Sequence, residues 1–260
     1  MNPSLIASWK ARDWRGAVLP LLLLAAWLAA THRGWVNTRL IVPPAKVLET
    51  GLQELRHGEF YTGMAWSLGR DLAGLLLGTL AGVGIGLLLG ASRLADKLLG
   101  PTFHTVRQIS LFAWLPLLSA LVGTGDLSKV IFIAFSAFYP VVLGTMEGVK
   151  GVTLSHIEVA RVYGFTPWQV LSRVVLPSAA PQMAGGARLG LIYAWLATIG
   201  AEFLLVSEGN GLGSIVFRGR AAFNVELILF GLFVIALIGI GFNRLAGAAE
   251  QRLLPWRQKA

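Results

Sequence analysis

A chain of 260 residues that is 55% hydrophobic and 13% charged, with a mean hydropathy of +0.67, is too apolar for a soluble domain of this size. Its net charge of +9 would suggest nucleic-acid binding in a soluble protein, but the basic residues lie mostly between apolar segments, so we discount nucleic acid as a partner. The absence of cysteine excludes disulfides, thiolate catalysis and cysteine-ligated metals, and the four histidines are widely separated, so no metal site is predicted.

Six stretches are apolar over roughly the 20 residues that are needed to cross the hydrocarbon of a bilayer. They lie at about residues 17–31, 68–91, 106–123, 129–148, 187–206 and 225–243. The first follows a basic start, as in a secretory signal peptide, but no small-x-small cleavage pattern follows it, so we interpret it as a retained anchor. The sequence therefore predicts an all-α membrane protein whose six transmembrane helices occupy residues 17–245, between an N-terminus (1–16) and a tail (246–260).

Lysine and arginine residues predict the orientation, because they are enriched in cytoplasmic loops. Basic residues precede the first predicted span, follow the second, occur in a long loop at residues 150–186, and end the chain. They are Lys10, Arg12, Arg15, Arg93, Lys97, Lys150, Arg161, Arg173, Arg244, Arg252, Arg257 and Lys259. We therefore expect a multi-pass membrane protein, in contact with lipid, with both termini and this loop in the cytoplasm.

The external segment between the first two spans is expected to contain one short helix. Residues 34–44 are rich in turn formers, and residues 45–55 have the pattern of an amphipathic helix that lies outside the membrane. A simple connector and a surface that meets a binding protein are both open interpretations of this helix.

The second predicted span has a glycine at every fourth position. These glycines are Gly74, Gly78, Gly82, Gly86 and Gly90. They form one nearly continuous stripe along a helix, so a neighbouring helix can approach its backbone closely. We interpret the stripe as helix packing, with lining of a transport pathway as the alternative.

Charged residues at membrane depth are expected to face protein or water. Arg107, Glu147 and Arg188 lie within about a turn of predicted cytoplasmic span ends, where long side chains reach the interface. Glu202 lies fourteen residues beyond Arg188, about 21 Å along a helix, and therefore in the outer half of its span. We expect it to pair with an arginine such as Arg70 or Arg218. Structural and pathway roles both remain open for Arg70, Arg188 and Glu202.

Residues 158–181 (EVARVYGFTPWQVLSRVVLPSAAP) interrupt the apolar chain and predict two short helices joined by a hinge. The first ends at Gly164, because glycine adopts a left-handed helix terminus without steric cost. The second begins with a capping box formed by Thr166 and Gln169, with proline in the first helical position. Pro177 is expected to end it. This second helix is amphipathic and too short to span a bilayer, so we expect it to dock on another surface.

This loop resembles the EAA loop of ABC-importer permeases. The resemblance is carried by Glu158, Val159, Ala160, Gly164, Val174, Leu176 and Pro177 at the spacing of that family, and only Val159 departs from the pattern, conservatively. In that family the loop inserts into a cleft of a separate ATPase subunit, so the resemblance implies a transport subunit that is not itself an enzyme. It implies a coupling role for Glu158, Ala160, Gly164, Thr166, Gln169, Leu176 and Pro177. An ordinary cytoplasmic loop is the alternative.

Further segments resemble the permeases of nitrate, sulfonate and taurine importers. These segments are Ser67, Leu68 and Arg70, and residues 107–116, 129–148, 188–202 and 207–213. The resemblance covers most of residues 34–245 and implies a type I permease bundle with cytoplasmic coupling helices. It also implies a second permease copy, two ATPase subunits that bind ATP and Mg, and an extracytoplasmic solute-binding protein, with no cofactor on this chain. Residues 119–122 (SALV) depart from a Trp-Phe pair found in many relatives.

The resemblance predicts import of a small anion, with aliphatic sulfonates or taurine first and nitrate, bicarbonate or a pyrimidine-type vitamin precursor as alternatives. A secondary transporter that works without ATP is the alternative class, but the expected intramembrane acid or base relays and inverted repeats are not visible in the sequence. A membrane enzyme would need clustered nucleophiles or paired carboxylates, so no catalytic residue is predicted. Residues 209–213 (GNGLG) lack the lysine and hydroxyl of a nucleotide-binding loop and are expected to form an external turn.

Overall fold

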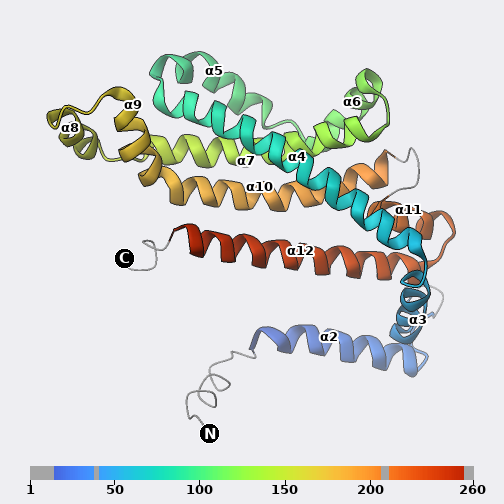
Figure 1. Cartoon of the computed structure of the whole chain (residues 1–260). Helices are drawn as coiled ribbons and strands as arrows, with labels where there is room; N and C mark the ends of the chain where they lie inside the picture. Colours follow the sequence, from blue (N-terminus) through green and yellow to red (C-terminus); the bar gives the residue numbers. More distant parts are fainter. Residues whose placement is uncertain (1–14, 38–40, 206–210, 255–260) are drawn as a thin grey trace, which may run out of the picture.

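The computed structural model describes residues 15–37, 41–205 and 211–254, and every regular element in these ranges is a helix (Figure 1). The long helices are α2 (Arg15–His32), α4 (Gly58–Ala91), α7 (Asp126–Lys150), α10 (Leu176–Leu204) and α12 (Val225–Leu253). The shorter helices are α3 (Pro44–Glu54), α5 (Arg93–Val106), α6 (Trp114–Val122), α8 (Leu154–Val162), α9 (Pro167–Val170) and α11 (Leu212–Ala221). The all-α fold class is confirmed. The predictions for residues 1–14, 206–210 and 255–260 lie outside the described residues.

Four of the six predicted spans are single long helices. α4, α7, α12 and the continuous segment Pro167–Leu204 are each long and apolar enough to cross a membrane. The first predicted span corresponds to α2, whose apolar part, Val18–His32, is shorter. By length and composition, the described residues therefore hold four spans, or five if the bent pair described next forms one.

The third predicted span, residues 106–123, is not a straight helix. α5 and the segment Leu111–Val122 meet at an angle of 85°. Ser110, which precedes this second segment, has φ −54° and ψ 131°, so the α-helical conformation is interrupted there. The predicted bounds of this span therefore differ from the structure, because the hydrophobicity of a sequence indicates the length of an apolar run and does not indicate a break in the backbone.

The helix ends sort to two sides of the bundle (Figure 1). α8 and α9 lie at one end, together with the N-terminal end of α2 and the C-terminal end of α12. α3 and α11 lie at the opposite end. The structure therefore separates the predicted coupling loop from the predicted external elements by the full length of the bundle.

The glycine stripe of α4 packs against α7. A Cβ atom added at Gly74, Gly78, Gly82, Gly86 or Gly90 would come within 3.0 Å of an atom of α7. The contacted backbone carbonyls belong to Val130, Ala134, Phe138, Val142 and Met146, so each turn of α4 meets the matching turn of α7. This geometry supports the packing interpretation of the stripe over the lining of a pathway.

α10 completes the central group of helices on the other side of α7. Gly144 and Gly186 approach closely, since a Cβ added at either glycine would lie 2.7–2.8 Å from backbone atoms of the facing helix. Farther along the same two helices, Phe132, Ile133 and Ala137 of α7 are fully buried in a cluster with alanines of α10. α4, α7 and α10 are thus held together by small residues that allow the backbones to approach.

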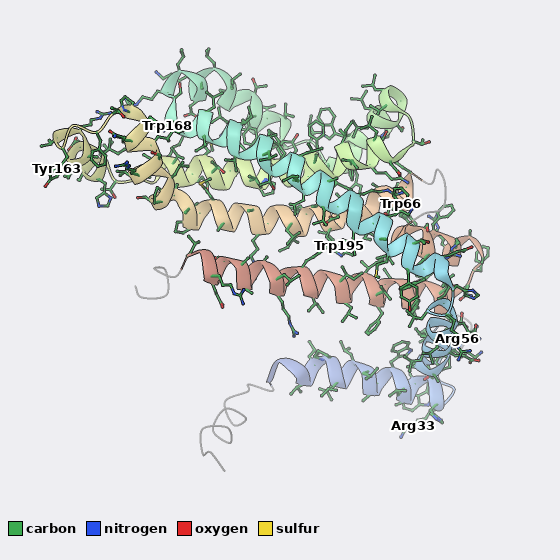
Figure 2. The ribbon with its side chains drawn as sticks, viewed as in Figure 1. Arg33, Arg56, Trp66, Tyr163, Trp168 and Trp195 are labelled. Atoms are coloured by element: carbon green, nitrogen blue, oxygen red, sulfur yellow. The ribbon has the colours of Figure 1, made fainter. Side chains whose placement is uncertain are left out.

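The remaining helices attach to this group through aromatic side chains. Trp195 of α10 lies between α10 and α12 (Figure 2), and its Nε1–H donates to the carbonyl of Ile235 at 3.1 Å. The predicted amphipathic helix at residues 45–55 is α3, in which Gly51 packs against the ring of Phe230 from α12. α2 lies apart from the bundle (Figure 1), and Trp27 of α2 donates to the carbonyl of Val42 at 3.0 Å.

Candidate coupling surface and buried polar network

α8 ends in a Schellman motif, as the hinge prediction requires. The N–H of Phe165 donates to the carbonyl of Ala160 at 3.1 Å, and the N–H of Gly164 donates to the carbonyl of Arg161 at 2.9 Å. Gly164 has φ +76°, and no atom lies within 4 Å of a Cβ added there. Glycine is therefore favoured at this position by backbone conformation and not by lack of space.

The predicted capping box at the start of α9 is confirmed. Gln169 Oε1 accepts a hydrogen bond from the N–H of Thr166 at 2.8 Å, and Thr166 Oγ1 accepts one from the N–H of Gln169 at 3.4 Å. These two bonds satisfy backbone donors that the helix itself leaves without a partner. The hinge between α8 and α9 therefore has a defined geometry on both sides.

The prediction that Pro177 ends the second helix was wrong. A π-helical turn, Leu171–Val175, follows α9 and leads directly into α10, where Pro177 occupies one of the first positions. Proline breaks an α-helix because it lacks an N–H and meets the carbonyl four residues earlier. A π turn changes this hydrogen-bond register immediately before the proline. The coupling element thus continues into a transmembrane helix without a stop.

Apolar residues on the inner side of the loop hold it against the bundle. Ala160, Val170 and Val175 are each less than 9% exposed and pack with Val149 and Ala179. Ala160 therefore lies inside the chain and does not form part of the outer surface. Its small side chain serves the coupling element indirectly, by allowing α8 to pack closely.

The outer side of the loop exposes large apolar side chains. Val162 is 87% exposed, Tyr163 78% and Trp168 71%. Figure 2 shows Tyr163 and Trp168 at the tip of the molecule, on the side away from the central helices. Glu158 is also exposed. Exposed apolar groups that gather at one place mark an interaction surface, so we name this tip, defined by these four residues, the coupling surface.

A hollow of about 730 Å³ lies beside the coupling surface. Pro177 lines it together with Val159 of α8 and Arg173 of the π turn. Leu176 is half-buried at the same junction. The structure thus brings the predicted residues Glu158, Ala160, Gly164, Thr166, Gln169, Leu176 and Pro177 into one compact unit, partly on its surface and partly beneath it.

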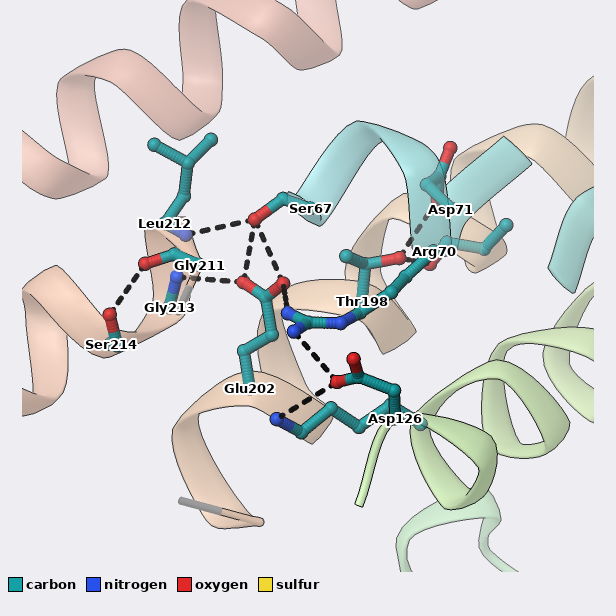
Figure 3. Close-up of polar contacts among 12 residues, drawn as sticks. Ser67, Arg70, Asp71, Asp126, Thr198, Glu202, Gly211, Leu212, Gly213 and Ser214 are labelled. Atoms are coloured by element: carbon teal, nitrogen blue, oxygen red, sulfur yellow. Dashed lines mark hydrogen bonds and ion pairs between the residues drawn. The ribbon is translucent and has the colours of Figure 1, made fainter. Parts of the chain in front are cut away.

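A second group of predicted residues meets at the opposite end of the bundle, inside the protein (Figure 3). Arg70 Nη1 of α4 lies 2.9 Å from Glu202 Oε1 of α10, and both side chains are at least 95% buried. Of the two partners that the sequence left open for Glu202, the structure selects Arg70. Arg218 instead lies 3.5 Å from Glu54.

Glu202 also binds the start of α11. Its Oε2 accepts a hydrogen bond from the N–H of Gly213 at 3.0 Å, and Ser67 donates to both carboxylate oxygens at 2.8 Å. Ser67 in turn accepts from the N–H of Leu212 at 2.8 Å. A carboxylate is favoured at a helix N-terminus, where free N–H groups gather.

The glycines near this helix start make room for the carboxylate. Gly211 has φ +145°, and a Cβ added there would overlap the carboxyl group of Glu202. A Cβ on Gly213 would lie 2.7 Å from the Cβ of Glu202. In the described part of residues 209–213, Gly211 and Gly213 therefore allow the backbone to approach the side chain of Glu202 closely.

The network extends to α7 through residues that the sequence analysis did not identify. Arg70 Nη2 lies 2.7 Å from Asp126 Oδ1, and Lys129 Nζ lies 3.9 Å from the same oxygen. Cations and carboxylates alternate along this chain of contacts, so each buried charge has a partner of opposite sign, although Asp126 itself is half-exposed. Asp126 and Lys129 are spaced i, i+3 at the start of a span, a pattern that could have suggested the pair. We name these residues, together with Ser67, Arg70 and Glu202, the outer network.

Two further contacts of α10 involve one residue that was not predicted, Thr198, and one that was, Arg188. Thr198 of α10 donates to Asp71 at 2.9 Å, a buried contact beside the outer network that the sequence did not indicate. Arg188 donates to Asn243 Oδ1 at 2.8 and 3.2 Å and lies 3.7 Å from Glu250, so it joins α10 to α12. It lies farther from a helix end than predicted, because α10 begins at Leu176 and not at residue 187.

Comparisons with known proteins agree with this architecture. Residues 74–255 match the family described as binding-protein-dependent transport system inner membrane component. The putative aliphatic sulfonates transport permease protein SsuC of Bacillus subtilis is 31% identical over 249 residues, which cover 95% of this chain and 90% of that protein. The taurine transport system permease protein TauC of Escherichia coli is 31% identical over 92% of this chain and 87% of its own length. The bicarbonate transport system permease protein CmpB of Synechocystis is 27% identical over 95% and 92%.

Solved structures share the fold. A chain of the inward-facing MetNI methionine ABC transporter has a TM-score of 0.56 at 22% identity and covers 72% of this chain and 94% of its own length. A chain of an amino acid ABC transporter crystallised with histidines has a TM-score of 0.61 at 19% identity and covers 75% and 94%. The predicted type I permease bundle is thereby confirmed. The chain belongs to the family of inner membrane components of binding-protein-dependent transport systems.

Proposed function

We propose that this chain is the permease subunit of an ATP-driven importer that moves a small anion, most favourably an aliphatic sulfonate or taurine, across the inner membrane. The observation that carries the proposal is the coupling surface, an exposed apolar tip on a rigidly capped pair of helices that is continuous with a transmembrane helix. The named relatives for sulfonates, taurine and bicarbonate support an anionic substrate.

The proposal includes partners and orientation. Two ATPase subunits that bind ATP and Mg would dock on the coupling surfaces of two permease copies, and an extracytoplasmic binding protein would deliver the anion. Both termini and the coupling surface would face the cytoplasm, and this chain would bind no cofactor and catalyse no reaction. Nitrate, bicarbonate or a pyrimidine-type vitamin precursor are the substrates to test next.

The test is ATP-dependent uptake by a reconstituted complex. The tagged chain should copurify with an ATPase subunit that contains a nucleotide-binding loop. Proteoliposomes of this complex, with the binding protein and ATP, should accumulate taurine or ethanesulfonate. Uptake by the isolated chain in the absence of ATP would instead identify an ATP-independent secondary transporter.

Gly164→Val is expected to abolish the stimulation of ATP hydrolysis by substrate-loaded binding protein. Valine at φ +76° is strained by about 1–3 kcal/mol, so the Schellman motif should rearrange and displace the coupling surface. The matched control is Gly164→Asn, because asparagine tolerates the left-handed region and should retain most of the stimulation. Full stimulation by the valine variant, at equal amounts in the membrane, would remove this hinge from the mechanism.

A further inference from the structure

A hollow of about 710 Å³ lies between the bend that joins α5 to α6, α7 and α10. Five of its polar lining residues come from three separate elements: Arg107 and Gln108 from the bend, Tyr139 from α7, and Gln182 and Tyr193 from α10. We name this space, defined by these five residues, the central hollow. It is distinct from the coupling surface and from the outer network.

Aromatic contacts place the bend at the middle of α7. The ring of Phe103, near the end of α5, lies 6.3 Å from that of Phe138 and 6.0 Å from that of Tyr139. Beyond the bend, the ring of Phe112 lies 5.8 Å from that of Phe132. Residues 107–110 therefore lie between the levels of Phe132 and Tyr139, near the centre of the helix Asp126–Lys150.

This placement corrects the prediction for Arg107. The sequence analysis put Arg107 near a cytoplasmic span end, where its side chain would reach the interface. Because α5 precedes the bend, Arg107 instead lies beside the middle of α7, a helix long and apolar enough to cross a membrane. Arginine there faces protein or water and not lipid.

The backbone at the bend also indicates that this region faces protein or water and not lipid. Non-helical backbone at membrane depth is tolerated only where it is buried in protein or lines a water-filled cavity. Residues 107–110 are all exposed in this chain and are therefore not buried by it. Gly185 and Gly186 of α10 also line the hollow and place no side chain in it. The central hollow is thus expected to contain water in the assembled importer.

We propose that the central hollow is a transit site for the small anion, with Arg107 as its positive charge. This inference rests on the proposed function and assigns a substrate site to it. Among the described residues, no carboxylate lies within ion-pair distance of Arg107, so its charge is available. A guanidinium group offers paired N–H donors to the oxygen atoms of a sulfonate or carbonate group, and Gln108, Tyr139 and Tyr193 supply further polar hydrogens.

The hollow also contains a carboxylate, at its inner end. Glu147 lies eight residues beyond Tyr139, about 12 Å along α7, and Gln182 Nε2 donates to it at 3.4 Å. The anion is therefore expected at the Arg107 end, away from Glu147. One exposed cation with neutral donors provides weak binding, as a passage requires if the anion is to leave again.

Cysteine labelling tests whether the hollow is open to water, and the chain has no native cysteine to interfere. In the reconstituted complex, Gln108→Cys and Gln182→Cys should react with an anionic methanethiosulfonate reagent, and saturating taurine should slow the reaction at Gln108→Cys. The control is Leu80→Cys, at an apolar position on α4 that is 65% exposed, which should not react. Labelling at Gln108→Cys no faster than at Leu80→Cys would overturn the proposal.

Uptake tests the role of the charge. Arg107→Gln should lower taurine or ethanesulfonate uptake at least tenfold while ATP hydrolysis stimulated by the loaded binding protein persists, and Arg107→Lys should restore part of the uptake. The matched control is Arg93→Gln, which removes an exposed arginine from the opposite end of α5. Equal uptake by both glutamine variants would refute the site but leave the proposed function standing. Lack of ATP-dependent anion uptake by the unmodified complex would refute the proposed function itself.

Discussion

Glu202→Ala is expected to destabilise the protein by about 3–5 kcal/mol, because it removes a buried carboxylate that pairs with the buried guanidinium of Arg70. The substitution also removes the acceptor for Ser67 and for the N–H of Gly213. Each of these donors would then be buried without that bond, which adds to the loss. The measurement is the temperature at which the purified chain loses its folded, monodisperse state in detergent.

Two variants make this result specific. The transition temperature of Glu202→Gln should lie between those of Glu202→Ala and the unmodified chain, because the amide oxygen can still accept a hydrogen bond but carries no charge. Glu54→Ala is the matched control, since Glu54 pairs with a half-exposed Arg218 at 3.5 Å, and such pairs contribute about 0–1 kcal/mol. If Glu202→Ala and Glu54→Ala lower the transition temperature equally, the outer network does not stabilise the fold.

Gly78→Ala is expected to lower stability by about 1–3 kcal/mol, although alanine favours a helix more than glycine does. The added methyl group would overlap the backbone carbonyl of Ala134 and lie 2.9 Å from the Cβ of Ala137. A backbone carbonyl cannot rotate away as a flexible side chain can, so α4 and α7 would have to separate. The same thermal measurement in detergent applies.

Gly84→Ala is the control for this substitution on the same helix. No atom lies within 4 Å of a Cβ added at Gly84, so alanine there should be neutral or stabilising by up to about 1 kcal/mol. The two variants make the same chemical change and differ only in what the methyl group meets. Equal transition temperatures would show that the glycine stripe does not determine how closely the helices pack.

Sequence reasoning succeeded where the determinants are local. The stripe of glycines, the left-handed residue at Gly164 and the capping box at Thr166 each depend on residues a few positions apart. The glycine stripe indicates that another helix can approach closely, and the other two features indicate helix ends whose backbone groups are hydrogen-bonded. Each can be recognised before any tertiary contact is known. These features account for the packing of α4 and for the shape of the coupling element.

Sequence reasoning was incomplete where partners are distant. Arg70 and Glu202 are 132 residues apart, and the sequence offered two arginines for one carboxylate. Asp126 enters the outer network from α7, and its contact with Arg70 depends on how three helices pack. Such ion pairs depend on how the helices pack in the bundle. The sequence therefore predicts that Glu202 pairs with an arginine, but it does not determine which arginine.

Two errors came from signals that have more than one structural outcome. Pro177 predicts a helix stop, but a π turn before it lets the helix continue. The apolar run at residues 106–123 predicts one span, but a bend of 85° lies at its start, and the helix Arg93–Val106 precedes that bend. In both cases composition indicated the elements correctly, whereas the path of the backbone depended on neighbours.

The continuity of the coupling element with α10 has a mechanical consequence. The segment Pro167–Leu204 runs from the coupling surface to Glu202, whose carboxylate is bonded to the start of α11 and to α4. No break separates α9, the π turn and α10, so in the proposed importer a displacement of the coupling surface by the ATPase subunit would be transmitted along the backbone to the outer network. Opening on one face and closing on the other would then be a single movement.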